Sequence, residues 1–267
     1  MTARDLAPNA AGESAPAKIA TWLIAGLLPL VIVALFILFA LLESRFLRTA
    51  NLINLLRNAS YLTVIATGQM LVLIIGGFDL SVGAVVALAS VTTALTMTSL
   101  QAAGLESIVL VIALGCLAGL IAGAIVGAVN GACVNYLKIS PFMVTLGTMS
   151  VAAGVALYLT SGVPIYGMPD EFTRGFGRFR IAGIPFVIYL TFLILACTWV
   201  MMNHTILGRY IYAIGGNPQA TRNSGVSTDL YLIVTYMLCG LLAATTGVLL
   251  TARVGSGEAT LGGTLML

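Results

Sequence analysis

Few side chains of this 267-residue chain could take part in covalent or metal chemistry. The only histidine, His204, has no carboxylate near it in the sequence, whereas metal sites need clusters of His, Cys or carboxylate ligands. The only lysines, Lys18 and Lys138, follow Ala17 and Leu137, so the Gly-Lys pair of a phosphate-binding P-loop is absent from the sequence. No catalytic, metal or cofactor site is therefore predicted, and the chain is not expected to be an enzyme.

Asp79 is the only candidate for an ionisable group buried in the membrane, which proton or ion coupling would require. It lies in residues 76–83 (GGFDLSVG), where paired glycines end one helix and Asp79 or Ser81 can cap the next. A carboxylate at the bilayer centre costs about 3 kcal/mol. The segment is therefore either a break inside the bilayer that lines a cavity, or a tight interfacial turn capped by Asp79.

The clearest signal for a partner is a polar segment at residues 203–229, between two long apolar runs. Asn217 is a favoured N-cap, Pro218 falls at the first helical position, and Gly225 lies where a left-handed C-cap is needed. Together they predict a helix of about two turns, in water between two membrane spans. Such a helix offers a surface for another protein to bind.

The elements that position these residues follow from the charge pattern. Hydrophobic residues make up 60% of the chain and charged residues 8%, against about 25% charged in soluble domains. Seven runs lack Asp, Glu, Lys and Arg, and each exceeds the roughly 20 residues that cross a bilayer: 19–42, 58–78, 80–105, 107–137, 139–169, 181–208 and 230–252. We expect an all-α polytopic membrane helix bundle of about seven transmembrane helices, with a cytoplasmic segment 1–18 before a single domain over 19–267.

The apolar core of the first run, Trp22 to Leu42, is longer than the about 7–15 apolar residues of a cleaved signal, which favours an uncleaved signal-anchor. Lys and Arg are balanced between the two sets of loops, so the positive-inside rule does not decide the orientation. Residues 43–57 are expected to form an amphipathic helix on the membrane surface. The four cysteines form no C-x-x-C pair, and the net charge of +3 is too small to indicate nucleic acid.

Glycine recurs every four residues from Gly115 to Gly131. Successive positions advance about 40° around a helix, so they form an oblique groove that lets a neighbouring helix approach closely. Static packing is the first interpretation of this groove, and a sliding helix pair is the alternative. The loop at 162–182 is long for a connector and is interpreted as a solvated loop, a docking surface or a lid.

Three motifs together resemble the permeases of ribose-type sugar ABC importers. Residues 76–83 are similar to that family's GGIDLSVG signature, and Asn130-Gly131 with Pro141–Met149 is similar to its NG…PFIxTLGT segment. Residues 207–225 are similar to its cytoplasmic loop, and the resemblance runs from about residue 46 to 256. Relatives continue through about three more helices, to about ten, so the resemblance implies a chain truncated at its C-terminus.

The resemblance implies a permease that moves a monosaccharide, ribose-like, across the bacterial inner membrane. A periplasmic sugar-binding protein would deliver the sugar, and cytoplasmic ABC ATPase subunits would drive transport. A second permease subunit would complete the pore, in a homodimer or a pair of different permeases. On this basis the cytoplasmic coupling loop is 204–228. Its ATPase-coupling residues would be Gly208, Arg209, Gly215, Gly216, Asn217, Pro218, Gln219, Ala220, Thr221, Arg222, Ser224 and Gly225.

Polar side chains in or beside the spans are the candidates for the translocation path. A polar residue in lipid usually faces the bundle interior, more often toward a neighbouring helix than toward substrate. These candidates are Gln69, Asp79, Ser81, Asn130, Thr145 and Thr148. Two alternatives to an ABC permease stay open: an ion-coupled secondary transporter that depends on Asp79, and a membrane partner subunit that does not transport.

Overall fold

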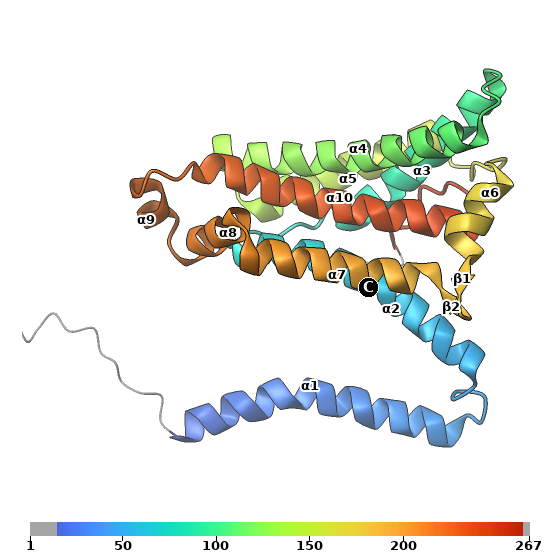
Figure 1. Ribbon diagram of the computed structural model, residues 1–267. Helices are drawn as coiled ribbons and strands as arrows, with labels where there is room; N and C mark the ends of the chain where they lie inside the picture. The colour runs from blue at the N-terminus through green and yellow to red at the C-terminus, as the bar shows by residue number, and fades with distance from the viewer. Residues whose placement is uncertain (1–14, 264–267) are drawn as a thin grey trace, which may run out of the picture. The chain divides into compact units, whose positions relative to one another are not determined.

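Long helices make up most of the chain (Figure 1). The computed structural model describes residues 15–263, with side chains for Leu27 and residues 29–263, so most of the predicted N-terminal segment 1–18 lies outside the described residues. The long helices are α1 (Ala15–Leu42), α2 (Thr49–Ile74), α3 (Val82–Ala102), α4 (Ile108–Tyr136), α5 (Pro141–Thr160), α7 (Phe186–His204) and α10 (Thr228–Val254). Between them lie α6 (Asp170–Phe172), the π-helix η1 (Thr173–Arg178), the strands β1 (Arg180–Ile181) and β2 (Ile184–Pro185), α8 (Ile206–Gly216) and α9 (Pro218–Asn223).

Each of the charge-free runs holds all or most of one long helix, although α1, α2 and α10 extend beyond their runs. Within the described residues, five helices are long and apolar enough to cross a membrane, namely α3, α4, α5, α7 and α10. The described side chains of α1 form a shorter apolar stretch, Pro29–Leu42. α2 is a continuous helix that carries polar residues such as Asn58, Ser60 and Gln69, and it is not among these five helices. The all-α polytopic membrane bundle is therefore confirmed, while the number of seven spans stays a prediction.

Residues 1–54 and 55–267 form two compact units. In the first unit the chain turns after α1, and the ring of Phe46 packs against Phe36 and Phe39, with centroids 5.1 and 5.9 Å apart. The side chain of Asn51 donates a hydrogen bond to the carbonyl of Phe46 at 2.8 Å, which fixes the start of α2 at this turn. The helix predicted at 43–57 is present only from Thr49, as the first turns of the long helix α2, because residues 43–48 form a turn. Its location on the membrane surface stays a prediction.

The core of the second unit forms where α4 packs along α3 and α10. The glycines of α4 make this packing possible: Gly115 and Gly119 face α3, whereas Gly123, Gly127 and Gly131 face α10. A Cβ atom at any of these positions would collide with the neighbouring helix, in α10 mostly with backbone atoms. The predicted oblique groove is thus confirmed, and it is filled by two helices in turn.

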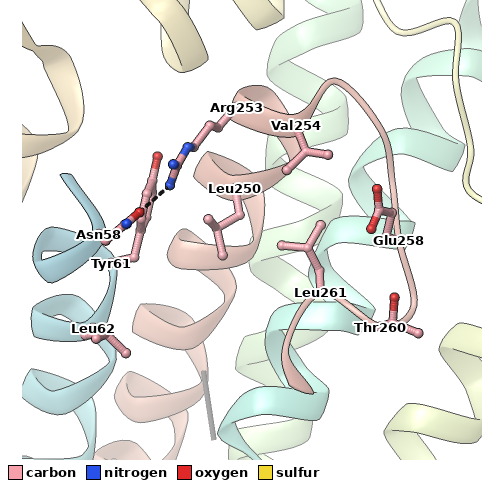
Figure 2. A pocket seen from close by; sticks show the side chains of 9 residues that line it. All are labelled: Asn58, Tyr61, Leu62, Leu250, Arg253, Val254, Glu258, Thr260 and Leu261. Carbon is pink, nitrogen blue, oxygen red and sulfur yellow. Dashed lines mark hydrogen bonds between the residues drawn. The ribbon is translucent and has the colours of Figure 1, made fainter. Parts of the chain in front are cut away.

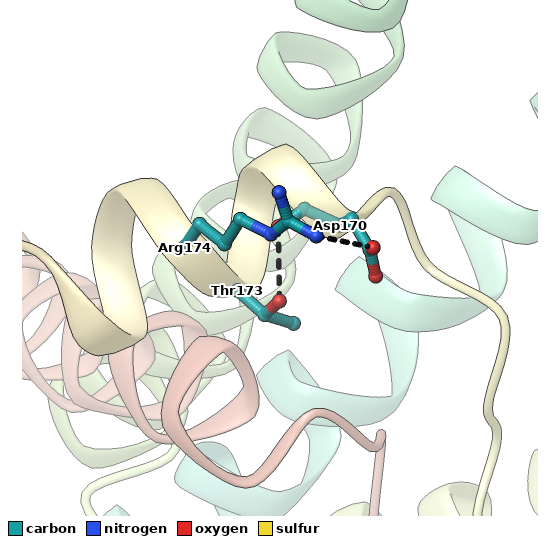
Figure 3. Close-up of polar contacts among 3 residues, drawn as sticks. All are labelled: Asp170, Thr173 and Arg174. Carbon is teal, nitrogen blue, oxygen red and sulfur yellow. Dashed lines mark hydrogen bonds and ion pairs between the residues drawn. The ribbon is translucent and has the colours of Figure 1, made fainter.

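The segment predicted as a loop at 162–182 folds into short elements at the end of the bundle opposite α9 (Figure 1). Backbone N–H and carbonyl groups of Ile165 and Gly257 pair in both directions at 2.9 Å. Figure 3 shows the start of α6, where the Thr173 hydroxyl donates to the Asp170 carbonyl at 2.9 Å and Arg174 pairs with the Asp170 carboxylate at 3.1 Å. The backbone pairing with Gly257 anchors the segment, so it is not an irregular connector, and most of its side chains are exposed.

Candidate functional site

The helix predicted inside the polar segment is present as α9. The side chain of Asn217 accepts a hydrogen bond from the backbone N–H of Ala220 at 2.9 Å, and Pro218 occupies the first helical position. Gly225 has a φ of +82°, in the left-handed region that the predicted cap requires. The local signals in the sequence were therefore sufficient to locate this helix.

α9 stands at one end of the bundle with most of its surface exposed (Figure 1). Of its six residues only Thr221 is buried. The guanidinium of Arg222 donates to the Thr228 hydroxyl at 3.1 Å and forms an ion pair with Asp229, both in the first turn of α10. α9 is thus an exposed helix whose last turn is bonded to the start of a long core helix.

The polar segment contains a second helix, α8, that the sequence analysis missed. Gly208, Ile211 and Ile214 are its buried positions, with the spacing of three that marks one face of a helix. Ile211 and Ile214 pack in a cluster with side chains of α2 and α10, including Leu71 and Tyr236. The apolar spacing of 208, 211 and 214 was the available signal, and the surrounding polar residues obscured it.

Two glycines proposed for ATPase coupling lie against the rest of this chain. A Cβ atom at Gly208 would collide with the backbone of Met202, and one at Gly215 would collide with the carbonyl of Ile74 at the end of α2. At Gly216, by contrast, no heavy atom lies within 4 Å of a Cβ position. Gly215 therefore lets α8 lie against α2, and through α8 it positions the base of α9.

Four of the six path candidates meet in one buried cluster. Asp79 is 2% exposed, and its carboxylate accepts hydrogen bonds from the backbone N–H and the hydroxyl of Ser81 at 2.8 and 2.6 Å. The amide of Asn130, from α4, donates to the Ser81 hydroxyl at 2.9 Å. With its side-chain amide oriented to suit both neighbours, Gln69 bonds the backbone N–H and carbonyl of Asp79 at 3.2 and 3.1 Å.

This cluster closes the break between α2 and α3 inside the bundle. Gly77 lies against the hydroxyl end of Tyr236 from α10, where a side chain would not fit. The carboxylate of Asp79 replaces hydrogen bonds that the interrupted helices cannot make themselves, as unpaired backbone groups are costly in a buried site. The break is therefore buried among α2, α4 and α10. The side chains of Asp79, Ser81 and Asn130 bond one another there, whereas the side-chain oxygens of Asn130 and Tyr236 have no hydrogen-bond partner among the described residues.

The other two path candidates lie apart from this cluster, on α5. Thr145 is fully buried and donates its hydroxyl to the carbonyl of Pro141 at 2.8 Å, and Thr148 donates to the carbonyl of Thr145 at 3.2 Å. Both hydroxyls therefore bond their own helix. Within the described residues no group of three or more His, Cys, Asp or Glu side chains could hold a metal ion.

Comparisons with known proteins identify relatives over most of the chain. Residues 51–267 match the family model described as branched-chain amino acid transport system / permease component. The ribose import permease protein of Escherichia coli (strain K12) is 35% identical over 237 residues, which cover 86% of this chain and 71% of the relative. The corresponding ribose protein of Bacillus subtilis (strain 168) is 40% identical over 229 residues, 85% of this chain and 68% of the relative.

A permease named for a different sugar is similar to the same degree. The galactose/methyl galactoside import permease protein of Salmonella typhimurium is 35% identical over 254 residues, 91% of this chain and 75% of the relative. No solved structure matches the chain. The chain is therefore similar, over about 70% of their length, to permeases named for different sugars.

Proposed function

This chain belongs to the family of branched-chain amino acid transport system permease components, and from that premise we propose that it is the permease subunit of an ABC importer for a monosaccharide. It is a multi-pass inner-membrane protein, in keeping with its apolar helices and its sugar-permease relatives. The relatives are named for ribose, galactose or methyl galactoside, and allose, all of which are monosaccharides or their simple derivatives. The substrate class follows from these names.

The observation that carries this proposal is the position of α9. The helix is exposed on the bundle's end, is capped at both ends, and is bonded through Arg222 to the first turn of α10. A force applied to α9 by an ATPase therefore reaches a helix that packs along α3 and α4. α8, seated on α2 and α10, holds the other end of α9 in place.

We infer the partners from this arrangement and from the family. Cytoplasmic ABC ATPase subunits bind α9 and close on ATP, a periplasmic sugar-binding protein delivers the sugar, and a second copy of the permease completes the pore. The exposed apolar side chains of α4 and α5 supply the surfaces that lipid or the second copy covers. We propose that Asp79, Ser81, Asn130 and Gln69 hold the helix break that shapes the path, with Thr145 and Thr148 on a separate helix.

The test replaces residues 217–224 with a Gly/Ser linker of equal length in a cell that carries the ATPase and the binding protein. Uptake of labelled monosaccharide and co-purification of the ATPase should both be lost, because the capped helix no longer forms. The amount of permease in the membrane fraction should be unchanged. Lys138→Gln is the matched control, since Lys138 lies outside α9 in the connection between α4 and α5 and is exposed.

Three results would count against the proposal. Uptake that is unaffected by ATP depletion but abolished by an ionophore would indicate an ion-coupled secondary transporter. A permease that retains the ATPase after the linker replacement would show that α9 is not the site of contact. Absence of uptake with partners still bound would indicate a membrane subunit that does not transport.

A further inference from the structure

A polar pocket lies at the end of α10 opposite α9, between α2, α10 and the segment that follows α10 (Figure 2). α10 has 27 residues, so about 40 Å separate its two ends. The pocket has a volume of about 490 Å³, within the range of roughly 300–1,000 Å³ typical of small-molecule sites. On the proposed orientation it opens at the outer face of the membrane.

The wall on the α2 side carries fixed hydrogen-bond donors. One nitrogen of Arg253 donates to the side-chain oxygen of Asn58 at 2.7 Å, and the guanidinium lies 5.5 Å from the ring centroid of Tyr61. These contacts orient the guanidinium but use only one of its five N–H groups in a hydrogen bond. The remaining donors are available to a ligand that offers oxygen acceptors.

The facing wall carries a fixed acceptor, the carboxylate of Glu258. One of its oxygens accepts a hydrogen bond from the Ser256 hydroxyl at 2.6 Å. The backbone N–H of Glu258 donates to the Ser90 hydroxyl at 3.2 Å, and the Thr251 hydroxyl donates to the same oxygen at 2.6 Å. The segment that carries Glu258 is thus tied to α3 and α10, which holds the carboxylate in position before any ligand arrives.

The two charged groups line one pocket without pairing. Arg253 and Glu258 form no ion pair among the described residues, and each keeps hydrogen-bonding capacity that its own partners do not use. Thr260 adds a hydroxyl, and Leu62 and Leu250 add apolar surface (Figure 2). A ligand that both accepts and donates hydrogen bonds and has an apolar C–H face would satisfy all of these groups, which describes a sugar ring.

We propose that this pocket binds one neutral monosaccharide at the outer end of the permease, a step that rests on the proposed transport function. Arg253 and Asn58 bond the sugar's oxygens, Glu258 and Thr260 bond its hydroxyl hydrogens, and the leucines contact its C–H face. One positive and one negative group in the lining favour a neutral ligand over an anion. Arg57, one turn before Tyr61, adds positive charge nearby, so phosphate is the competing ligand that the test must include.

The test places a reporter thiol in the pocket by Thr260→Cys in the full chain. The chain is studied in right-side-out membrane vesicles with the ATPase present. Labelling by a membrane-impermeant maleimide is measured with D-ribose, D-galactose or D-allose, and with inorganic phosphate or glycine betaine as comparison solutes. At least one of the sugars should slow labelling several-fold, while phosphate and betaine leave it unchanged. The unsubstituted chain gives the background from the four native cysteines, and Leu62→Cys is a second reporter should the first variant not insert.

Adding Glu258→Gln to the reporter should raise the sugar concentration that protects by about tenfold, because a hydrogen bond to a charged group is lost. Glu171→Gln is the matched control, an exposed carboxylate on the outer segment that does not line the pocket. Protection by phosphate instead of sugar, no protection in either reporter, or no effect of Glu258→Gln would overturn the proposal. Uptake by the unsubstituted chain is measured in parallel, so a permease that imports sugar without protecting the pocket rejects this site and leaves the transport function standing.

Discussion

At the scale of single residues, hydrogen bonds between buried polar side chains hold the break between α2 and α3. Asp79 bonds Ser81 twice, and Asn130 reaches the same hydroxyl from α4. A buried donor that loses its acceptor costs about 1–3 kcal/mol, since water cannot replace the lost bond. The cluster therefore stabilises the break between α2 and α3, whatever else it contributes to transport.

This role separates two substitutions at Asp79. Asp79→Leu leaves the backbone N–H and hydroxyl of Ser81 without their acceptor, so the thermal unfolding temperature of the permease in detergent should fall measurably. Asp79→Asn keeps an acceptor oxygen of similar shape and should retain most of the stability and the ATP-driven uptake. Loss of uptake in a stably folded Asp79→Asn protein would instead support coupling to an ion.

At the scale of elements, each helix near α9 has a distinct structural task. α8 lays an apolar face on α2 and α10, its Tyr210 ring stacks edge-on against Tyr231 at 4.8 Å, and α9 then projects from the bundle. Because α8 and α9 are short, their own hydrogen bonds could not hold them as isolated helices. Their stability comes from the seat on the bundle and from the bonds between Arg222 and the start of α10.

The contact between α8 and α2 can be tested by substituting two neighbouring glycines of α8. Gly215→Ala places a methyl group against the carbonyl of Ile74, so α8 must move away from α2, and ATPase co-purification and sugar uptake should both fall. Gly216→Ala is the matched control, because a Cβ atom there meets nothing within 4 Å. Equal behaviour of the two variants would show that the contact between α8 and α2 does not position α9.

Local sequence signals predicted the helix whose ends are marked by capping residues. Asn217, Pro218 and Gly225 located α9 because caps depend on neighbouring residues alone. The glycine spacing of α4 identified a packing face, but only tertiary contacts divide it between α3 and α10. The bond between Arg253 and Asn58 joins residues far apart in the chain, and no pattern in the sequence pairs them.

At the scale of the whole molecule, α10 joins the two ends of the second unit, and a function is proposed for each end. α9 lies at one end, and the polar pocket with the folded segment of α6, η1 and the β-hairpin lies at the other (Figure 1). Sequence charge did not decide which end is cytoplasmic, because basic residues occur in both sets of loops. The proposed function places α9 in the cytoplasm, and this placement can be measured directly.

Single cysteines at the two ends should report opposite sides of the membrane. Ala103→Cys lies in the exposed connection between α3 and α4. It should react with a membrane-impermeant maleimide in spheroplasts, whose inner membrane is intact. Asn223→Cys, exposed at the end of α9, should react only after the inner membrane is permeabilised. The reverse pattern would invert the topology and remove α9 from reach of a cytoplasmic ATPase.

The glycine face of α4 also sets when the core of the second unit can pack during synthesis. Gly123 and Gly127 are shaped to receive the backbone of α10, but α10 lies about a hundred residues further along the chain. At about 5–20 residues per second, roughly 5–20 s pass between synthesis of the two helices. During that interval no helix packs on the part of the glycine face of α4 that contacts α10. The core of the second unit therefore forms only after α10, the last of the described long helices, has been synthesised.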